Sequence, residues 1–458
     1  MPDAMIELDI TTPWEPPPGQ PPPRRRRRPL RLAVVLALVV GLLSGAGARR
    51  DLAPLYGPGL QVITVLAGGG QLYLVRPQLS RDGTVVEAGT VIEAVDAAGG
   101  GLLWRRSLDR AEPVVATDRI VLLQEEHAGE GTRRIFALDA ATGAVRWERA
   151  EGWVVGLADP PGRLVLLNDR VWRSLAEGLD TSYGDPEDPA VALPMVPNDE
   201  RYVAVEPDTG RVVWSVEMPP GTVPSLSMTT YPVLTGLTDL DAGGVLRVHD
   251  VRTGALAATY RLDWSGPVAR HEDGVSGQQV VYRAGGRGAD VYDRVSGRLL
   301  WHWAGDAAHN GPYPCLDGRY CVLTGEGTDV LDAATGARLW QADGYGSGVL
   351  YPAGGLVLVA HPQARDAPNG LVAFAGDTGA VRWRLKGWLP IFGSTGSGPF
   401  VWRTTNLGDA VIGRLDPADG TVRVIGRTHD FNRDARCAAT DSRLACVAAG
   451  ALFVWALP

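Results

Sequence analysis

The stretch Asp332-Ala-Ala-Thr-Gly-Ala-Arg-Leu-Trp340 recurs, with variations, along most of this chain. Residues 139–147 are a near copy, and six further copies keep the glycine in the same place. Glycine supplies the positive φ of a tight turn, and Asp and Thr side chains hydrogen-bond to backbone groups within such turns. Each copy therefore predicts a β-hairpin whose turn is set by the acidic residue, the threonine and the glycine.

The spacing of the turn glycines predicts the fold class. All but one of the intervals between them are 39 to 44 residues long, and the exception is 67. The glycines are Gly100, Gly143, Gly210, Gly254, Gly297, Gly336, Gly379 and Gly420. A period of this length with several short strands per repeat is typical of propeller blades. We therefore predict an all-β, eight-bladed propeller, with strands such as residues 113–116, 119–124, 133–138 and 144–148 in the second blade.

A tryptophan follows the turn glycine at a constant offset in six of the eight copies. These residues are Trp104, Trp147, Trp214, Trp301, Trp340 and Trp383. A sheet of four strands cannot bury both of its faces alone, so neighbouring blades must stack. The large indole rings are expected to pack between blades and not to form a cofactor-stacking site.

Residues 135–143, Ile-Phe-Ala-Leu-Asp-Ala-Ala-Thr-Gly, are the copy that most closely resembles a consensus PQQ-like repeat. That repeat builds the eight-bladed propellers of quinoprotein dehydrogenases and of the BamB-type outer-membrane assembly lipoproteins. The resemblance covers roughly residues 60–458. It implies the fold and leaves the function open, because one scaffold hosts many roles.

The amino-terminal segment differs in composition from the propeller. Residues 1–29 are rich in proline and end in Arg24 to Arg28, which predicts a disordered cytoplasmic tail. Residues 30–48 contain an apolar run that predicts a single transmembrane signal anchor, followed by a linker at 49–59 and the propeller outside the cytoplasm. The alternative is a signal peptide cleaved near Ala48, which would release a secreted protein. No cysteine follows the run, so a lipoprotein of the BamB type is not expected.

The charge distribution bears on the kind of partner. Residues 1–50 hold eight arginines and four acidic residues, so the remaining chain has a formal net charge of −12, against −8 for the whole. An acidic propeller argues against nucleic-acid binding. The sequence instead favours an envelope protein partner for a monomeric chain.

The 67-residue interval places an insertion between the second and third strands of the third blade, near residues 172–200. The insertion is a candidate partner-binding loop, and the alternative is a solvated loop without a role. Its candidate residues are Trp172, Asp180, Tyr183, Asp185, Glu187 and Asp188.

The four cysteines form two pairs, and each pair flanks a turn between two predicted antiparallel strands. We predict the disulfides Cys315–Cys321 and Cys437–Cys446, which suit an oxidising compartment. The alternative of a metal site made by all four thiols is disfavoured, because the hairpins lie far apart and the spacing is not C-x-x-C.

The chain has no recognisable catalytic motif. Quinoprotein dehydrogenases that use this repeat carry adjacent cysteines beside the quinone, and this chain has no Cys-Cys pair. We therefore expect no PQQ, no other cofactor, no metal and no enzymatic activity. The function predicted from the sequence is a protein-interaction scaffold in the cell envelope. The alternatives are a small-molecule or saccharide-binding sensor propeller and a degenerate PQQ-dependent dehydrogenase.

Overall fold

The computed structural model divides the chain into two compact units, residues 1–50 and residues 51–458. All of the described residues belong to the second unit. They are residues 62–79, 85–126, 133–150, 152–158, 164–168, 200–230, 233–283, 288–305, 311–324, 327–343, 350–353, 355–361, 370–391, 399–405, 409–429, 431 and 435–457. The predicted tail, signal anchor and linker lie outside these ranges. Within them, no helix has the length and apolar character needed to cross a bilayer.

The described residues form β-strands and a single turn of 3-10 helix, η3 (Val275–Gly277). The first half contains β1 (Thr64–Gly68), β2 (Gln71–Leu79), β3 (Val85–Asp96), β4 (Leu102–Asp109), β5 (Ala111–Ala116), β6 (Ile120–Glu126), β7 (Arg133–Asp139), β8 (Val145–Arg149), β9 (Trp153–Ala158), β10 (Leu164–Asn168), β11 (Arg201–Val205), β12 (Val212–Glu217), β13 (Thr222–Thr230), β14 (Val233–Asp241), β15 (Val245–His249) and β16 (Leu256–Arg261). The second half contains β17 (Val268–Asp273), β18 (Gln278–Arg283), β19 (Ala289–Asp293), β20 (Leu299–Trp303), β21 (Tyr313–Leu316), β22 (Arg319–Leu323), β23 (Gly327–Asp332), β24 (Arg338–Asp343), β25 (Leu350–Ala353), β26 (Leu356–His361), β27 (Gly370–Ala375), β28 (Val381–Lys386), β29 (Leu389–Pro390), β30 (Phe400–Thr404), β31 (Ala410–Leu415), β32 (Val422–Thr428), β33 (Arg436–Ala439), β34 (Arg443–Ala448) and β35 (Ala451–Ala456).

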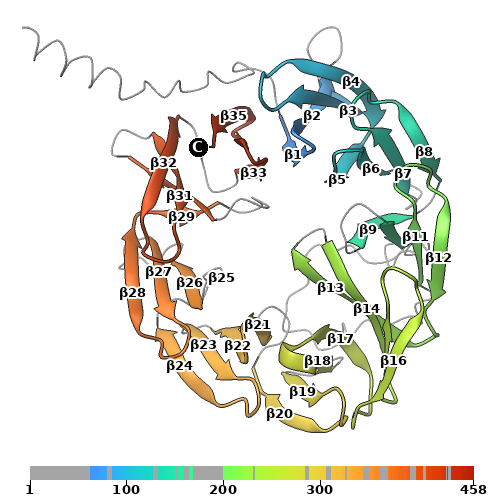
Figure 1. The fold of residues 1–458 in the computed structure, drawn as a ribbon, viewed down its shortest axis with the longest axis vertical. Coiled ribbons are helices and arrows are strands. Elements are labelled where there is room, and N and C mark those ends of the chain that lie inside the picture. The colour runs from blue at the N-terminus through green and yellow to red at the C-terminus, as the bar shows by residue number, and fades with distance from the viewer. Residues whose placement is uncertain are drawn as a thin grey trace, which may run out of the picture. The chain divides into compact units, whose positions relative to one another are not determined.

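Consecutive groups of four antiparallel strands form the blades, which follow one another around a ring (Figure 1). Blade 1 is β1–β4, and the numbering continues in fours to blade 8, which is β29–β32. The repeated glycine turn joins the third strand of each blade to the fourth, as predicted. The strands of blades 2 and 6 lie within one or two residues of the positions expected from the sequence.

The strand composition explains this arrangement. The second and third strands of each blade are continuous apolar runs, such as the wholly buried stretch Gly370–Ala375 of β27. A strand that is buried on both faces must lie in a sheet covered on both sides. The fourth strands instead alternate between exposed and buried residues, as in β28. The core is accordingly divided into clusters, each of which lies between two neighbouring sheets.

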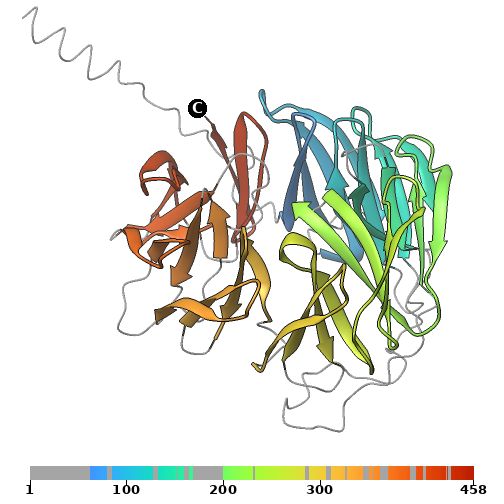
Figure 2. The same ribbon diagram turned by 60° about the horizontal axis from the view of Figure 1, so that its bottom comes forward.

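Blades 3 and 4 are joined into one sheet, which the repeat does not predict. β14 pairs with the innermost strand of blade 3, β9, through the parallel partners Val233–Leu157 and Leu234–Ala158. β13 and β14 are nine residues long and form the long yellow-green hairpin of Figure 2.

The ring is closed by a sheet of its own. The sequence predicts three strands after the eighth turn, and β33, β34 and β35 occupy those residues. The expectation that some of them would complete the amino-terminal blade is wrong, because they form a separate three-stranded sheet. One side of this closing sheet packs on blade 8 and the other on blade 1. A single backbone hydrogen bond from Val62 N to Gly450 O, 3.0 Å long, joins it to the start of the propeller.

Candidate interaction surface

The side chains of the repeated turn hold it in a fixed shape. In blade 6, Asp332 Oδ1 accepts hydrogen bonds from Ala334 N at 3.1 Å, Thr335 N at 2.9 Å and Thr335 Oγ1 at 2.7 Å. Gly336, at φ +69°, donates its N–H to Asp332 O at 2.9 Å. Each acidic side chain thus satisfies donors that would otherwise face solvent unpaired.

The same turn in blade 2 adds an ion pair. Asp139 accepts from the backbone and hydroxyl of Thr142, and its second oxygen pairs with Arg146 at 2.6 Å. Arg146 and then Thr142 lower the pKa of Asp139 to about 2. The turn carboxylate therefore stays ionised at any physiological pH.

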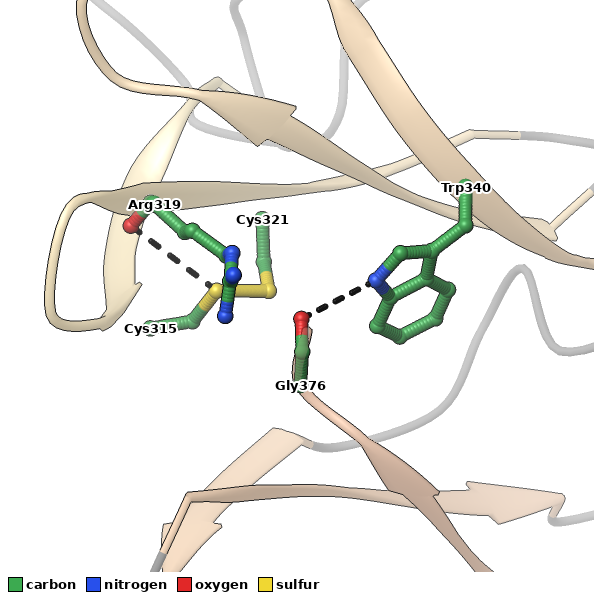
Figure 3. Close-up of a disulfide and its surroundings, with 5 residues drawn as sticks. All are labelled: Cys315, Arg319, Cys321, Trp340 and Gly376. Atoms are coloured by element: carbon green, nitrogen blue, oxygen red, sulfur yellow. Dashed lines mark hydrogen bonds between the residues drawn. A yellow bond between two sulfur atoms is a disulfide. The ribbon is translucent and has the colours of Figure 1, made fainter. Parts of the chain in front are cut away.

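The repeated tryptophans join each blade to the turn of the next. Trp340 Nε1 donates to Gly376 O in blade 7 at 3.1 Å (Figure 3). The corresponding bonds in other blades run from Trp104 to Ala140, Trp147 to Pro207, Trp301 to Ala333 and Trp383 to Pro417. The indole also covers the next turn glycine, and a Cβ on Gly143 would lie 2.6 Å from the ring of Trp104. The glycine is thus needed both for its positive φ and for the close approach of the indole.

The interface between blades 4 and 5 lacks this contact, because Ala258 stands at the tryptophan position of β16. Polar groups replace it. His271 of β17 is buried, and its Nε2 donates to Val223 O of β13 at 2.7 Å while its Nδ1 accepts from Gln279 Nε2 at 3.0 Å. Ser227 Oγ of β13 donates to Asp273 of β17. The innermost strands of the two blades are therefore bridged by hydrogen bonds.

Both predicted disulfides are present, which confirms this part of the sequence analysis. Cys315–Cys321 closes the first hairpin of blade 6 (Figure 3), and Cys437–Cys446 joins directly opposed residues of β33 and β34. All four side chains are buried. Burial limits access of a reducing thiol to the sulfur atoms.

Peptide mapping of the exported protein under non-reducing conditions is expected to yield the two linked pairs. The sulfur atoms in each hairpin are already bonded in the fold, and the described residues contain no free cysteine. Alkylation before and after unfolding measures the same property. Four reactive thiols in the exported protein would contradict the prediction.

A buried carboxylate lies where the insertion of blade 3 begins and ends. Glu200 precedes β11, and its Oε2 accepts from Tyr202 Oη at 2.7 Å and from Asn168 Nδ2 at 3.3 Å. Burial raises the pKa of Glu200 above its usual value. Asn168 is the last residue of β10, so these side chains tie the two ends of the insertion together. The sequence analysis missed this cluster, because a single glutamate beside a strand carries no motif.

The candidate partner loop itself cannot be placed. Its residues Trp172, Asp180, Tyr183, Asp185, Glu187 and Asp188 lie outside the described ranges, as does His309. The insertion does fall between the second and third strands of blade 3, as predicted. Across the described ranges, no group of three or more His, Cys, Asp or Glu side chains is arranged to hold a metal ion.

These features define a class of protein, a β-propeller of four-stranded repeats in which a tryptophan of one blade binds the turn of the next. The family model described as outer membrane protein assembly factor BamB matches residues 87–328 and 326–440. The chain belongs to this family. A comparison with curated proteins gives no match.

Solved structures give distant matches. BamB from Moraxella catarrhalis is 15% identical, with 76% of this chain and 97% of that chain covered and a TM-score of 0.38. The computationally designed Ika8 protein is 14% identical over 89% of this chain and 99% of that chain, with a TM-score of 0.42. A chain of the mitotic checkpoint complex is 12% identical over 56% and 81% of the two chains, with a TM-score of 0.34.

Proposed function

We propose that this protein is a non-enzymatic scaffold that binds protein partners in the cell envelope. The observation that carries the proposal is the match of most of the propeller to a family described as an assembly factor of the outer membrane. The indole contacts and the buried disulfides add rigidity, which lowers the entropic cost of presenting a binding surface.

The insertion of blade 3 is the proposed partner loop. The cluster of Asn168, Glu200 and Tyr202 fixes its two ends on adjacent strands. A long loop on a rigid scaffold is a common place for a binding function. Its acidic and aromatic residues would offer both charge and contact area to a partner.

We also propose that residues 30–48 anchor the chain with the propeller outside the cytoplasm. The apolar run and the preceding arginines support this orientation. The two disulfides agree with an oxidising compartment.

Cross-linking in intact cells, followed by capture of the tagged full-length chain, tests the scaffold. We expect a reproducible envelope partner whose capture is lost when residues 172–199 are replaced by a Gly-Ser linker of equal length. The matched control replaces residues 362–369, which connect the second and third strands of blade 7, in the same way and should leave capture unchanged.

A wild-type chain that captures no envelope protein would overturn the scaffold proposal. Equal loss of the partner in both linker variants would remove the special role of the insertion. The mass of the captured chain also tests the anchor, because a new amino terminus at Arg49 would show a cleaved signal peptide.

A further inference from the structure

The outermost strand of blade 2 carries an arginine that is neutralised by two carboxylates. Arg146 lies three residues after the turn glycine and pairs with Asp139 of its own turn at 2.6 Å. It also pairs with Asp208 in the turn of blade 3 at 2.5 Å. The repeat thus provides acidic partners for a cation at this position from two neighbouring turns.

Blade 7 keeps the cation and lacks both acids. Arg382 follows Gly379 by the same three residues, but Ala375 stands in the place of Asp139, and Ala418 in that of Asp208. The surrounding geometry is preserved, because Trp383 Nε1 donates to Pro417 O at 2.9 Å just as Trp147 donates to Pro207. Arg382 is therefore left without the two partners that the repeat gives to its counterpart.

The rest of β28 extends this positive charge. Its exposed positions after the first are Arg382, Arg384 and Lys386, and Lys386 is the only lysine of the chain. β28 contains no acidic residue, and exposed Arg423 and Arg427 add charge on β32 of blade 8. Among the described residues, no carboxylate forms an ion pair with Arg382, Lys386, Arg423 or Arg427. We call Arg382, Arg384 and Lys386 the basic edge.

The basic edge lies on an outermost strand. β28 pairs only with β27 among the described strands and runs along the outer circumference of the ring (Figure 1). Its pairing is regular from Trp383 to Lys386, with the single register shift before that stretch. The outer backbone groups of these residues are therefore free to pair with a further strand.

We infer that the basic edge binds an extended acidic segment of a protein partner, laid along β28. Residues two apart on a strand are separated by about 6.8 Å, so the three cations match carboxylates at alternate positions of an added strand. The propeller carries a net charge of −12, so this strand is a local positive site on an acidic surface. Its cations also repel the same edge of a second copy. The inference rests on the proposed scaffold function and names the chemistry of one partner.

The test uses fluorescent eight-residue peptides with alternating Thr and Glu, or Thr and Gln, and the full-length chain in detergent. The Glu peptide is expected to bind more tightly, and added salt should weaken it. The Arg382→Gln/Lys386→Gln variant is expected to bind the Glu peptide about tenfold more weakly. A second variant, Ala375→Asp/Ala418→Asp, recreates the carboxylates of blade 2 and should weaken binding while β28 itself stays unchanged.

The matched control is Arg261→Gln/Arg436→Gln, which removes two exposed cations elsewhere and should bind like the wild type. Equal binding of the Glu and Gln peptides, or of wild type and both test variants, would overturn the inference. Vesicles of phosphatidylglycerol and phosphatidylcholine form a separate arm. Loss of vesicle binding without loss of peptide binding would identify a lipid surface as the ligand and also overturn it.

Cross-linking of the same variants separates this inference from the scaffold proposal. Reduced capture of a partner by both test variants would support the basic edge as its binding site. Loss of peptide binding with unchanged capture of every partner would overturn the basic edge and leave the scaffold standing. A wild-type chain with no partner would overturn the scaffold, and the partner assigned to the basic edge with it.

Discussion

Replacing Trp301 by alanine is expected to lower the free energy of unfolding of the propeller by about 3–5 kcal/mol. The indole is 8% exposed and packs edge-on against Tyr320 of blade 6, with 5.4 Å between ring centroids. Its Nε1 donates to Ala333 O at 2.9 Å. Gly336 of the next turn leaves no space between its backbone and the ring, since a Cβ there would lie 2.5 Å from the indole. Truncation would therefore open a cavity that no neighbouring side chain fills.

Urea unfolding of the full-length chain measures this effect. The matched control is Leu299→Ala on the same strand, where the side chain is 45% exposed and its loss should change stability by no more than about 0.5 kcal/mol. Equal effects of the two substitutions would contradict the role of Trp301 between blades. A finer comparison uses Trp214, whose buried Nε1 has no hydrogen-bond partner among the described residues. Trp214→Phe is expected to cost less than Trp301→Phe.

The repeat predicts the blades well because its signals are local. The acid, threonine and glycine of residues 332–336 shape the turn through contacts within five residues. The offset of Trp340 then places its ring against the next blade. Each cysteine pair also spans one hairpin, so the pairing follows from two neighbouring strands.

The features that the sequence does not predict depend on contacts between distant segments. The closing sheet has no glycine turn of the repeated kind, and its separation from β1 follows from packing on two blades. The parallel pairing of β9 with β14 joins residues more than seventy positions apart. The basic edge had a visible signal, the loss of the first acid at Ala375, but its meaning required the paired arginine of blade 2 for comparison.

The polar interface of blades 4 and 5 predicts a loss of stability as the pH falls. Burial lowers the pKa of His271 to about 4, against the opposing effects of the Val223 carbonyl, Asp273 and Asp239. The unfolded chain binds a proton on this histidine near pH 6.5, whereas the fold resists it until about pH 4. The stabilising contribution of the neutral ring is therefore complete above the unfolded pKa. It is lost between these two values and amounts to about 3 kcal/mol.

His271→Gln is the variant that isolates this effect, because it removes the titration from the blade 4–5 interface. The gap in stability between wild type and variant should narrow by about 3 kcal/mol from pH 7.5 to pH 4. The exposed His429 gives the control, since His429→Gln should preserve the pH dependence of the wild type in this range.

The pH window distinguishes His271 from the acidic turns. Arg146 and Thr142 lower the pKa of Asp139 to about 2, so its contribution is complete above its unfolded value and disappears only below about pH 4. Burial raises the pKa of Glu200, so its effect has the opposite sign, and protonation of this residue favours the fold as the pH falls. Neither group changes in His271→Gln. A gap that stays constant between pH 7.5 and pH 4 would therefore show that His271 is not buried in the neutral form between the two blades.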